Sequence, residues 1–115
     1  MVDDDLATLE ATVSLVEAMG FHAKGFPSAH EFLNSDLRLL TRCLILDIRM
    51  PGMSGIDLFV HLSRAGRAVP TILATAFPDE VTRSRSLLAG VTCYLRKPFH
   101  ADELLACIRA ALGIA

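Results

Sequence analysis

The sequence predicts an α/β fold in which a doubly wound parallel sheet lies between layers of helices. Short apolar runs alternate with longer segments of helical periodicity along the whole chain. Glycine or proline separates most of these segments. The central short runs are apolar throughout, which is typical of strands covered on both faces. Strand and helix in strict alternation indicate right-handed βαβ units and therefore a parallel sheet.

The first part of the chain is predicted to hold one long helix and one short one. Apolar residues at steps of three and four predict a helix over residues 6–19, with Gly20 supplying the C-terminal cap. Residues 21–26 look extended. Ser28 is expected to cap a helical turn that continues through Leu33.

The middle of the chain begins with a continuous apolar run, residues 43–46, that stops abruptly at Asp47. This run predicts a buried strand. After a turn marked by Pro51 and Gly52, helical spacing resumes over residues 56–62, and Gly66 ends that helix.

The last part of the chain is predicted to hold two strands and two helices. Residues 71–75 and 91–95 are the strands. A helix over 78–88 is expected to begin with Pro78 near its first turn, where the helix dipole also favours the acids that follow. After a turn at 97–99, residues 102–112 form the closing helix.

Composition limits the possible functions. The chain has 115 residues, of which 52% are hydrophobic and 21% charged, so we expect one ordinary globular domain. Its net charge of -2 argues against direct binding to nucleic acid or anionic lipid. No apolar stretch approaches the roughly 20 residues of a membrane-spanning helix, and the acidic N-terminus is unlike a secretory signal. We therefore expect a cytoplasmic protein.

Cysteine and histidine give no sign of a metal or disulfide framework. Cys43, Cys93 and Cys107 stand far apart, without a CxxC pair, and the first two lie in apolar runs that favour buried free thiols. The four histidines have no i,i+4 pairing, so a zinc site is not expected.

Polar residues fall where the predicted strands end. In an open parallel sheet the working site lies beyond the carboxyl ends of the strands. The aspartates at 3–5 precede the first helix, Asp47 and Thr75 end two strands, and Lys97 follows another. We expect these side chains to meet at one edge of the sheet.

Bringing three carboxylates together requires cations. Two carboxylates about 5 Å apart repel by roughly 3 kcal/mol at an effective dielectric near 20. Gathering Asp3, Asp4 and Asp47 is therefore unfavourable unless Lys97 and a hard divalent cation such as Mg²⁺ (or Mn²⁺) compensate. A cation held there would also neutralise a phosphoryl group in transfer.

Each of these residues also has an ordinary structural explanation. The aspartates at 3–5 suit a solvated helix N-terminus. Asp47 can be a simple strand stop, and Thr75 a β-former at a strand edge. Lys97 can be a surface lysine, and Tyr94 a core aromatic. Their joint order at successive strand ends favours a common site.

Four segments resemble a known family. They are VDDD at 2–5, LILDIRMPGMSG at 44–55, LATA at 73–76 and YLRKPF at 94–99. In order and spacing they are similar to the CheY-like receiver domain of two-component response regulators, nearest to its FixJ-like branch. The likeness extends over residues 1–115.

The resemblance implies a role for each matching residue at the metal and acceptor site. Asp47 would be the phosphoacceptor, which attacks a phosphohistidine and becomes an aspartyl phosphate. Asp3, Asp4 and Asp47 would hold Mg²⁺, with the backbone carbonyl of Arg49 as a further ligand.

The resemblance also implies a switch. Thr75 would supply the switch hydroxyl, Lys97 the amine that contacts phosphate, and Tyr94 the aromatic ring that changes place. The Lys97–Pro98 peptide would be cis. Phe77 would flank the path of the attacking water, and we expect its bulk to lengthen the lifetime of the phosphoryl group.

The implied fold is flavodoxin-like, with strand order 2-1-3-4-5 and the first strand in the middle of the sheet. Only Met1 and Val2 precede Asp3 here, so the first strand is expected to be short or truncated. We expect one of three remedies: a minimal strand at residues 1–3, pairing with a strand-completing partner chain, or a rearranged sheet.

The function expected from this resemblance is a phosphorylation-dependent signalling switch. A sensor histidine kinase would phosphorylate Asp47, and the face near residues 78–97 would then change its affinity for partners, with a phosphorylation-dependent homodimer as one such pairing. The effector domain would lie outside this chain. Two alternatives remain at this point: an interaction module that is never phosphorylated, and an aspartate-nucleophile phosphatase.

Overall fold

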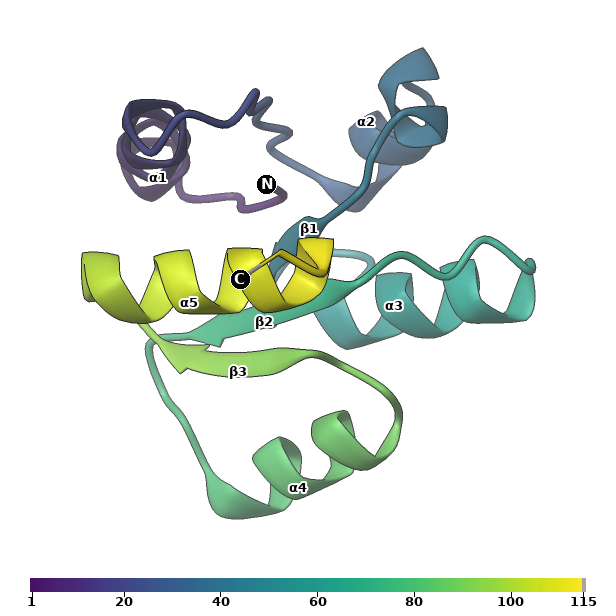
Figure 1. The fold of residues 1–115 in the computed structure, drawn as a ribbon. Helices are drawn as coiled ribbons and strands as arrows, with labels where there is room; N and C mark the ends of the chain where they lie inside the picture. The colour runs from purple at the N-terminus through teal and green to yellow at the C-terminus, as the bar shows by residue number, and fades with distance from the viewer. Residues whose placement is uncertain (115) are drawn as a thin grey trace.

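A computed structural model describes residues 1–114, and Figure 1 shows its helices and strands. In chain order these are α1 (Leu6–Ala18), α2 (Ala29–Leu33), the 3-10 helix η1 (Asp36–Leu39), β1 (Leu44–Asp47), α3 (Gly55–Arg64), β2 (Thr71–Thr75), α4 (Glu80–Leu88), β3 (Cys93–Arg96) and α5 (Ala101–Leu112). The alternation of strand and helix predicted from the sequence is confirmed.

The sheet is parallel, with the order β1-β2-β3. Val2 extends it on the other side of β1, because it forms parallel bridges both to Leu46 and to Phe26. Phe26 and Val2 therefore occupy the first two positions of the expected 2-1-3-4-5 order, each as an isolated bridge. Of the three remedies expected for the short first strand, the structure has the minimal strand.

Helices cover both faces of the sheet, as Figure 1 shows. On one face, α1 and α5 enclose an apolar cluster with Ile45 and Ile72 at its centre. On the other face, α2 and α3 pack against Leu46 and Leu73. Within residues 1–114 no helix is both long and apolar enough to cross a membrane.

Local capping explains where most helices begin. The Ser28 hydroxyl accepts a hydrogen bond from the Glu31 N–H, as predicted. Ser54 forms a reciprocal capping box with Asp57 at the start of α3. The α4 cap is Asp79.

Two predicted boundaries differ in the structure, and one element was not predicted. α4 begins at Glu80 instead of residue 78, with Pro78 directly before the Asp79 cap and so near the first turn, as predicted. The last strand is Cys93–Arg96 instead of 91–95, because pairing with β2 starts only at Cys93. The 3-10 helix η1 was not predicted, since one short turn has too few residues for a periodic pattern.

The cysteines also depart from the expectation of free thiols. Cys93 and Cys107 form a disulfide, while Cys43 remains free. Cys93 and Leu95 belong to the apolar cluster on the α5 side of the sheet, and Cys107 belongs to the buried face of α5. β3 and α5 are separate segments of the sequence, but they are adjacent in the fold, and this brings the two sulfurs together.

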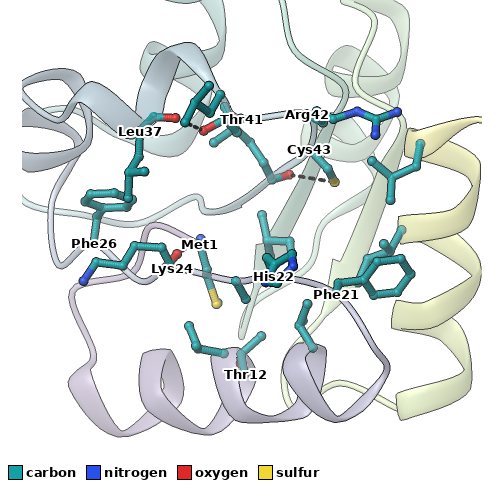
Figure 2. Close-up of a pocket in the computed structure, with 18 of the residues that line it drawn as sticks. Met1, Thr12, Phe21, His22, Lys24, Phe26, Leu37, Thr41, Arg42 and Cys43 are labelled. Atoms are coloured by element: carbon teal, nitrogen blue, oxygen red, sulfur yellow. Dashed lines mark hydrogen bonds between the residues drawn. The ribbon is translucent and has the colours of Figure 1, made fainter.

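An apolar cavity of about 690 Å³ lies at the amino end of β1. Figure 2 shows Met1 and Phe26 at this cavity, with Thr12 of α1 beneath them and Cys43 at the start of β1 opposite. The side chains that close it come from α1, α5, η1 and the extended segment 21–26. Met1, which directly precedes the bridging residue Val2, is part of the cavity's lining.

The backbone around this cavity has the geometry of an interrupted ladder. The Val2 N–H donates to the Ile45 carbonyl at 2.9 Å, and the Met1 amino group donates to the Lys24 carbonyl at 2.7 Å. By the alternation of a parallel ladder, the Ile45 N–H and the Cys43 carbonyl face the cavity. Burial lowers the pKa of the Met1 amino group to about 6, because the cavity solvates its charge poorly.

Extending the chain ahead of Met1 is predicted to stabilise the fold. About four added β-branched residues would continue the ladder with Ile45 and Lys24, fill the cavity and replace the poorly solvated amino group with a peptide bond. We expect the midpoint of thermal unfolding to rise by roughly 5–15 °C. A Gly-Ser extension of equal length is the matched control, and an equal rise in both extended proteins would contradict the prediction.

Candidate functional site

Four polar residues that lie at or just after strand ends meet at one edge of the sheet. Asp3 follows the bridge made by Val2, and Asp47 and Thr75 are the last residues of β1 and β2. Lys97 comes directly after β3, and its backbone N–H donates to the Thr75 carbonyl at 2.8 Å. The predicted convergence at this edge is therefore present in the structure.

Lys97 joins two of the aspartates in a buried ion cluster. Its Nζ lies 3.0 Å from Oδ2 of Asp3 and 3.1 Å from Oδ1 of Asp47. Asp3 is completely buried and Asp47 is 5% exposed. Contacts of this kind in a poorly hydrated place fix the positions of all three side chains, because removing any partner leaves a buried charge without compensation.

Asp4 completes an acidic group that fits a divalent cation. One carboxylate oxygen from each of Asp3, Asp4 and Asp47 can be chosen so that all lie within 4.8 Å of one another. Lys97 offsets only one of the three negative charges. The donors are all hard oxygens, which is the ligand set that Mg²⁺ prefers.

The charge imbalance appears in the acid-base properties of the site. Burial, with the neighbouring charge of Asp3, raises the pKa of Asp47 to about 6, although Lys97 acts in the opposite direction. Burial by itself would lower the pKa of Lys97, but its hydrogen bonds to Asp3 and Asp47 outweigh that and raise it. Lys97 is thus held as a cation, and the site favours additional positive charge.

Gly55 sets how closely α3 approaches the acidic edge. A Cβ at this position would lie within van der Waals overlap of the Asp47 carbonyl oxygen, and the Gly55 N–H donates to the Ile48 carbonyl. In the sequence this glycine is simply the last residue of the matching segment 44–55, and its close packing was not predicted. A glycine directly after a helix cap is the signal that was available, but the close approach depends on tertiary packing.

Thr75 and Phe77 contact each other just beyond the end of β2. Thr75 is 2% exposed, and its hydroxyl accepts a hydrogen bond from the Phe77 N–H at 3.1 Å. The Arg49 guanidinium lies over the Phe77 ring, 4.8 Å from its centre. The contact between Arg49 and Phe77 was not predicted from the sequence, since their loops are separate in the chain.

Tyr94 is connected to α4. Its ring packs against the apolar cluster on the face of the sheet that α2 and α3 cover. Its hydroxyl accepts a hydrogen bond from the N–H of Asp79, the cap of α4. Tyr94 therefore links β3 to the start of α4. The Lys97–Pro98 peptide beyond it is cis, as the resemblance implied.

Comparisons with known proteins agree with the geometry of the site. The response regulator receiver domain profile matches residues 1–109. The response regulator protein TmoT of Ectopseudomonas mendocina is 43% identical over 115 residues, which is all of this chain and 52% of that protein. The transcriptional regulatory protein FixJ of Azorhizobium caulinodans is 33% identical over 113 residues, 98% of this chain and 54% of FixJ.

Solved structures agree with these sequence relatives. The response regulator StyR superposes with a TM-score of 0.88 at 37% identity, covering 97% of this chain and 57% of StyR. The chain spans about half the length of the curated relatives it matches. With its fold, its acidic edge and these similarities, the chain belongs to the response regulator receiver domain family, whose members act in two-component signal transduction.

Proposed function

We propose that residues 1–115 form one receiver domain in which Asp47 accepts a phosphoryl group from a sensor histidine kinase, with Mg²⁺ bound beside it. The observation that carries this proposal is the buried cluster of Asp3, Asp47 and Lys97, with Asp4 at its rim. A cluster with more anions than cations at strand ends is costly for the fold. Its chemistry suits a site that takes up a divalent cation and a phosphoryl group.

Phosphoryl transfer uses this chain's residues in distinct ways. An Asp47 carboxylate oxygen attacks phosphorus, the bond from phosphorus to the kinase imidazole nitrogen breaks, and that nitrogen keeps the electron pair. Asp3, Asp4 and the Arg49 carbonyl would hold Mg²⁺, which when bound offsets charge on the phosphoryl oxygens. Lys97 keeps its proton and donates hydrogen bonds to the same oxygens.

The switch would begin at Thr75. Its hydroxyl acts as an acceptor toward the Phe77 N–H, so its own proton can be donated to a phosphoryl oxygen. Moving Thr75 would shift the loop that leads to Asp79, and with it the partner of the Tyr94 hydroxyl. A population shift of α4 and β3 then follows from local hydrogen bonding.

The surface that would change includes exposed apolar residues of α4. Val81 is 61% exposed and Leu88 is 89% exposed. Such side chains support a phosphorylation-dependent homodimer or contact with an effector domain outside this chain. Our proposal also includes a cytoplasmic location, where a sensor histidine kinase would phosphorylate the protein.

Two other functions are less well supported. An interaction module that is never phosphorylated would have no use for a lysine, 14% exposed, held between two buried aspartates. A phosphatase of the aspartate-nucleophile class would need a second acid two residues after Asp47, where this chain has Arg49.

Asp47→Asn is predicted to abolish phosphorylation. With acetyl phosphate and Mg²⁺, we expect the native protein to gain one phosphoryl group by intact mass and to change its fluorescence. Tyr94 is the single tyrosine of a chain without tryptophan, so this emission reports the proposed switch residue directly. The Asn variant should show neither change.

The exposed acid Glu10 provides a matched control, since Glu10→Gln should leave both signals intact. Phosphorylation without a Tyr94 signal would refute the switch but leave Asp47 as the acceptor. If the native protein binds Mg²⁺ but is not phosphorylated, the interaction module is correct instead.

The metal-free protein is predicted to lose stability as pH rises from about 4 to about 6. The pKa of Asp47 is 3.8 in the unfolded chain and about 6 in the fold, so the folded state binds the proton more tightly. This contribution is fully present below pH 4 and lost above pH 6. With a chelator at pH 7.5, we expect Asp47→Asn to unfold roughly 4–10 °C higher than the native protein.

Added Mg²⁺ should raise the midpoint of the native protein at pH 7.5 and have a smaller effect on the Asn variant. Thermal unfolding followed by circular dichroism measures both. A native midpoint that climbs steadily from pH 4 to 6 in the chelated protein would contradict the proposed charge imbalance.

Phe77→Ala is predicted to shorten the lifetime of the phosphoryl group. The Phe77 N–H bonds to the Thr75 hydroxyl and the Phe77 ring lies under the Arg49 guanidinium, and we expect this ring to hinder the approach of water to phosphorus. Removing it should speed dephosphorylation roughly three- to tenfold, or about 0.7–1.4 kcal/mol of barrier. Leu88→Ala is the control for loss of an exposed apolar side chain, and an unchanged rate in Phe77→Ala would refute the steric role.

A further inference from the structure

The disulfide between β3 and α5 lies outside the phosphoacceptor site. We propose that Cys93 and Cys107 form a reversible dithiol–disulfide site, oxidised by exchange with a low-molecular-weight disulfide, and that the oxidised form restrains β3 next to Tyr94. The second half of this proposal rests on the proposed function; the first half does not.

The geometry suits bond formation in the folded protein. The Cα atoms of Cys93 and Cys107 lie 6.1 Å apart, within the range that disulfides span without moving the backbone. Cys93 is partly exposed on the edge strand, whereas Cys107 is 9% exposed within α5. A small reagent therefore reaches Cys93 first, and Cys107 is placed to resolve the resulting mixed disulfide.

The fold does not depend on this bond. Leu104 and Ile108 of α5 are buried against Ile72 of β2 in the same apolar cluster. That packing holds the helix to the sheet in either redox state. A disulfide that adds to a complete core can open and close without unfolding the domain, which is the condition for reversible use.

The exchange balances as two sulfur displacements. The Cys93 thiolate attacks one sulfur of the reagent, forming a mixed disulfide and releasing one thiol. The Cys107 thiolate then attacks the Cys93 sulfur and releases the second thiol. The protein loses two electrons and two protons, and the reagent gains them; a dithiol reductant reverses both steps.

Cys43 serves as an internal reference. It is a free cysteine in the loop before β1, and it packs against the same apolar cluster as the pair. Burial raises the pKa of its thiol to about 11, so little of it is thiolate at neutral pH and it reacts slowly. Two of the three cysteines should therefore disappear together on oxidation, and the third should persist.

The position of the bond connects it to the switch. Cys93 directly precedes Tyr94 in β3, which is the edge strand of the sheet. Successive residues of a strand point to opposite faces, so the bond ties one face of β3 to α5 while Tyr94 contacts the start of α4 on the other. A disulfide at Cys93 restrains β3. It therefore opposes the displacement of this strand that a movement of Tyr94 would require.

The first experiment measures the redox reaction alone. The folded protein is incubated with reduced and then with oxidised glutathione, and its free thiols and intact mass are determined. We expect three thiols to fall to one, with a mass about 2 Da lower, and to return on reduction. The Cys93→Ser and Cys107→Ser variants should lose this reversible step, while Cys43→Ser keeps it.

The second experiment tests the effect on the switch. Reduced and oxidised protein are each treated with acetyl phosphate and Mg²⁺, and the Tyr94 fluorescence change is divided by the phosphoryl content from intact mass. We expect the change per phosphoryl group to be at least about twofold smaller in the oxidised protein. In Cys93→Ser, both redox conditions should give the response of the reduced native protein.

These outcomes separate the two proposals. Failure of the thiols to pair in the folded native protein, or only a mixed disulfide on Cys93, overturns the redox site whatever the phosphorylation result. Pairing with an equal Tyr94 response in both forms overturns the restraint on β3. Absence of phosphorylation in both forms refutes the proposed function and the restraint, while the thiol counts still decide the redox site.

Discussion

The interaction on which the rest of the site depends is the ammonium of Lys97 between the carboxylates of Asp3 and Asp47. It gathers two buried anions at one edge of the sheet and leaves the cluster, with Asp4, short of positive charge. An ordinary structural salt bridge would tend toward neutrality. The remaining imbalance is what makes this edge suited to a divalent cation and to the transfer of a charged group.

Backbone pairing fixes the positions of these charges. Asp3 lies where it does because Val2 bridges β1 on one side and Phe26 on the other. Lys97 is held by its N–H bond to the end of β2, and Gly55 lets the start of α3 come up against the Asp47 carbonyl. The charged groups are therefore placed by the ladder and by close packing before any ligand binds, which is the preorganisation that phosphoryl transfer needs.

The two ends of the sheet have opposite character. The carboxyl end concentrates charge on short, well-paired strand ends, whereas the amino end of β1 borders an apolar cavity where the ladder stops at Met1 (Figure 2). The edge strand β3 differs again, since it connects to α5 through sulfur on one face and to α4 through Tyr94 on the other. The acidic site, the apolar cavity and the contacts of Tyr94 thus lie on different parts of one small sheet.

The sequence by itself determined the order of helices and strands, the parallel sheet, and the meeting of Asp47, Thr75 and Lys97 at one edge. These follow from local periodicity and from the rule that parallel strands share a carboxyl end. Only the tertiary structure decided that Val2 suffices as a first strand, that Arg49 covers Phe77, and that Cys93 pairs with Cys107. Those contacts join segments distant in the chain, and their geometry depends on how the helices and loops pack onto the finished sheet.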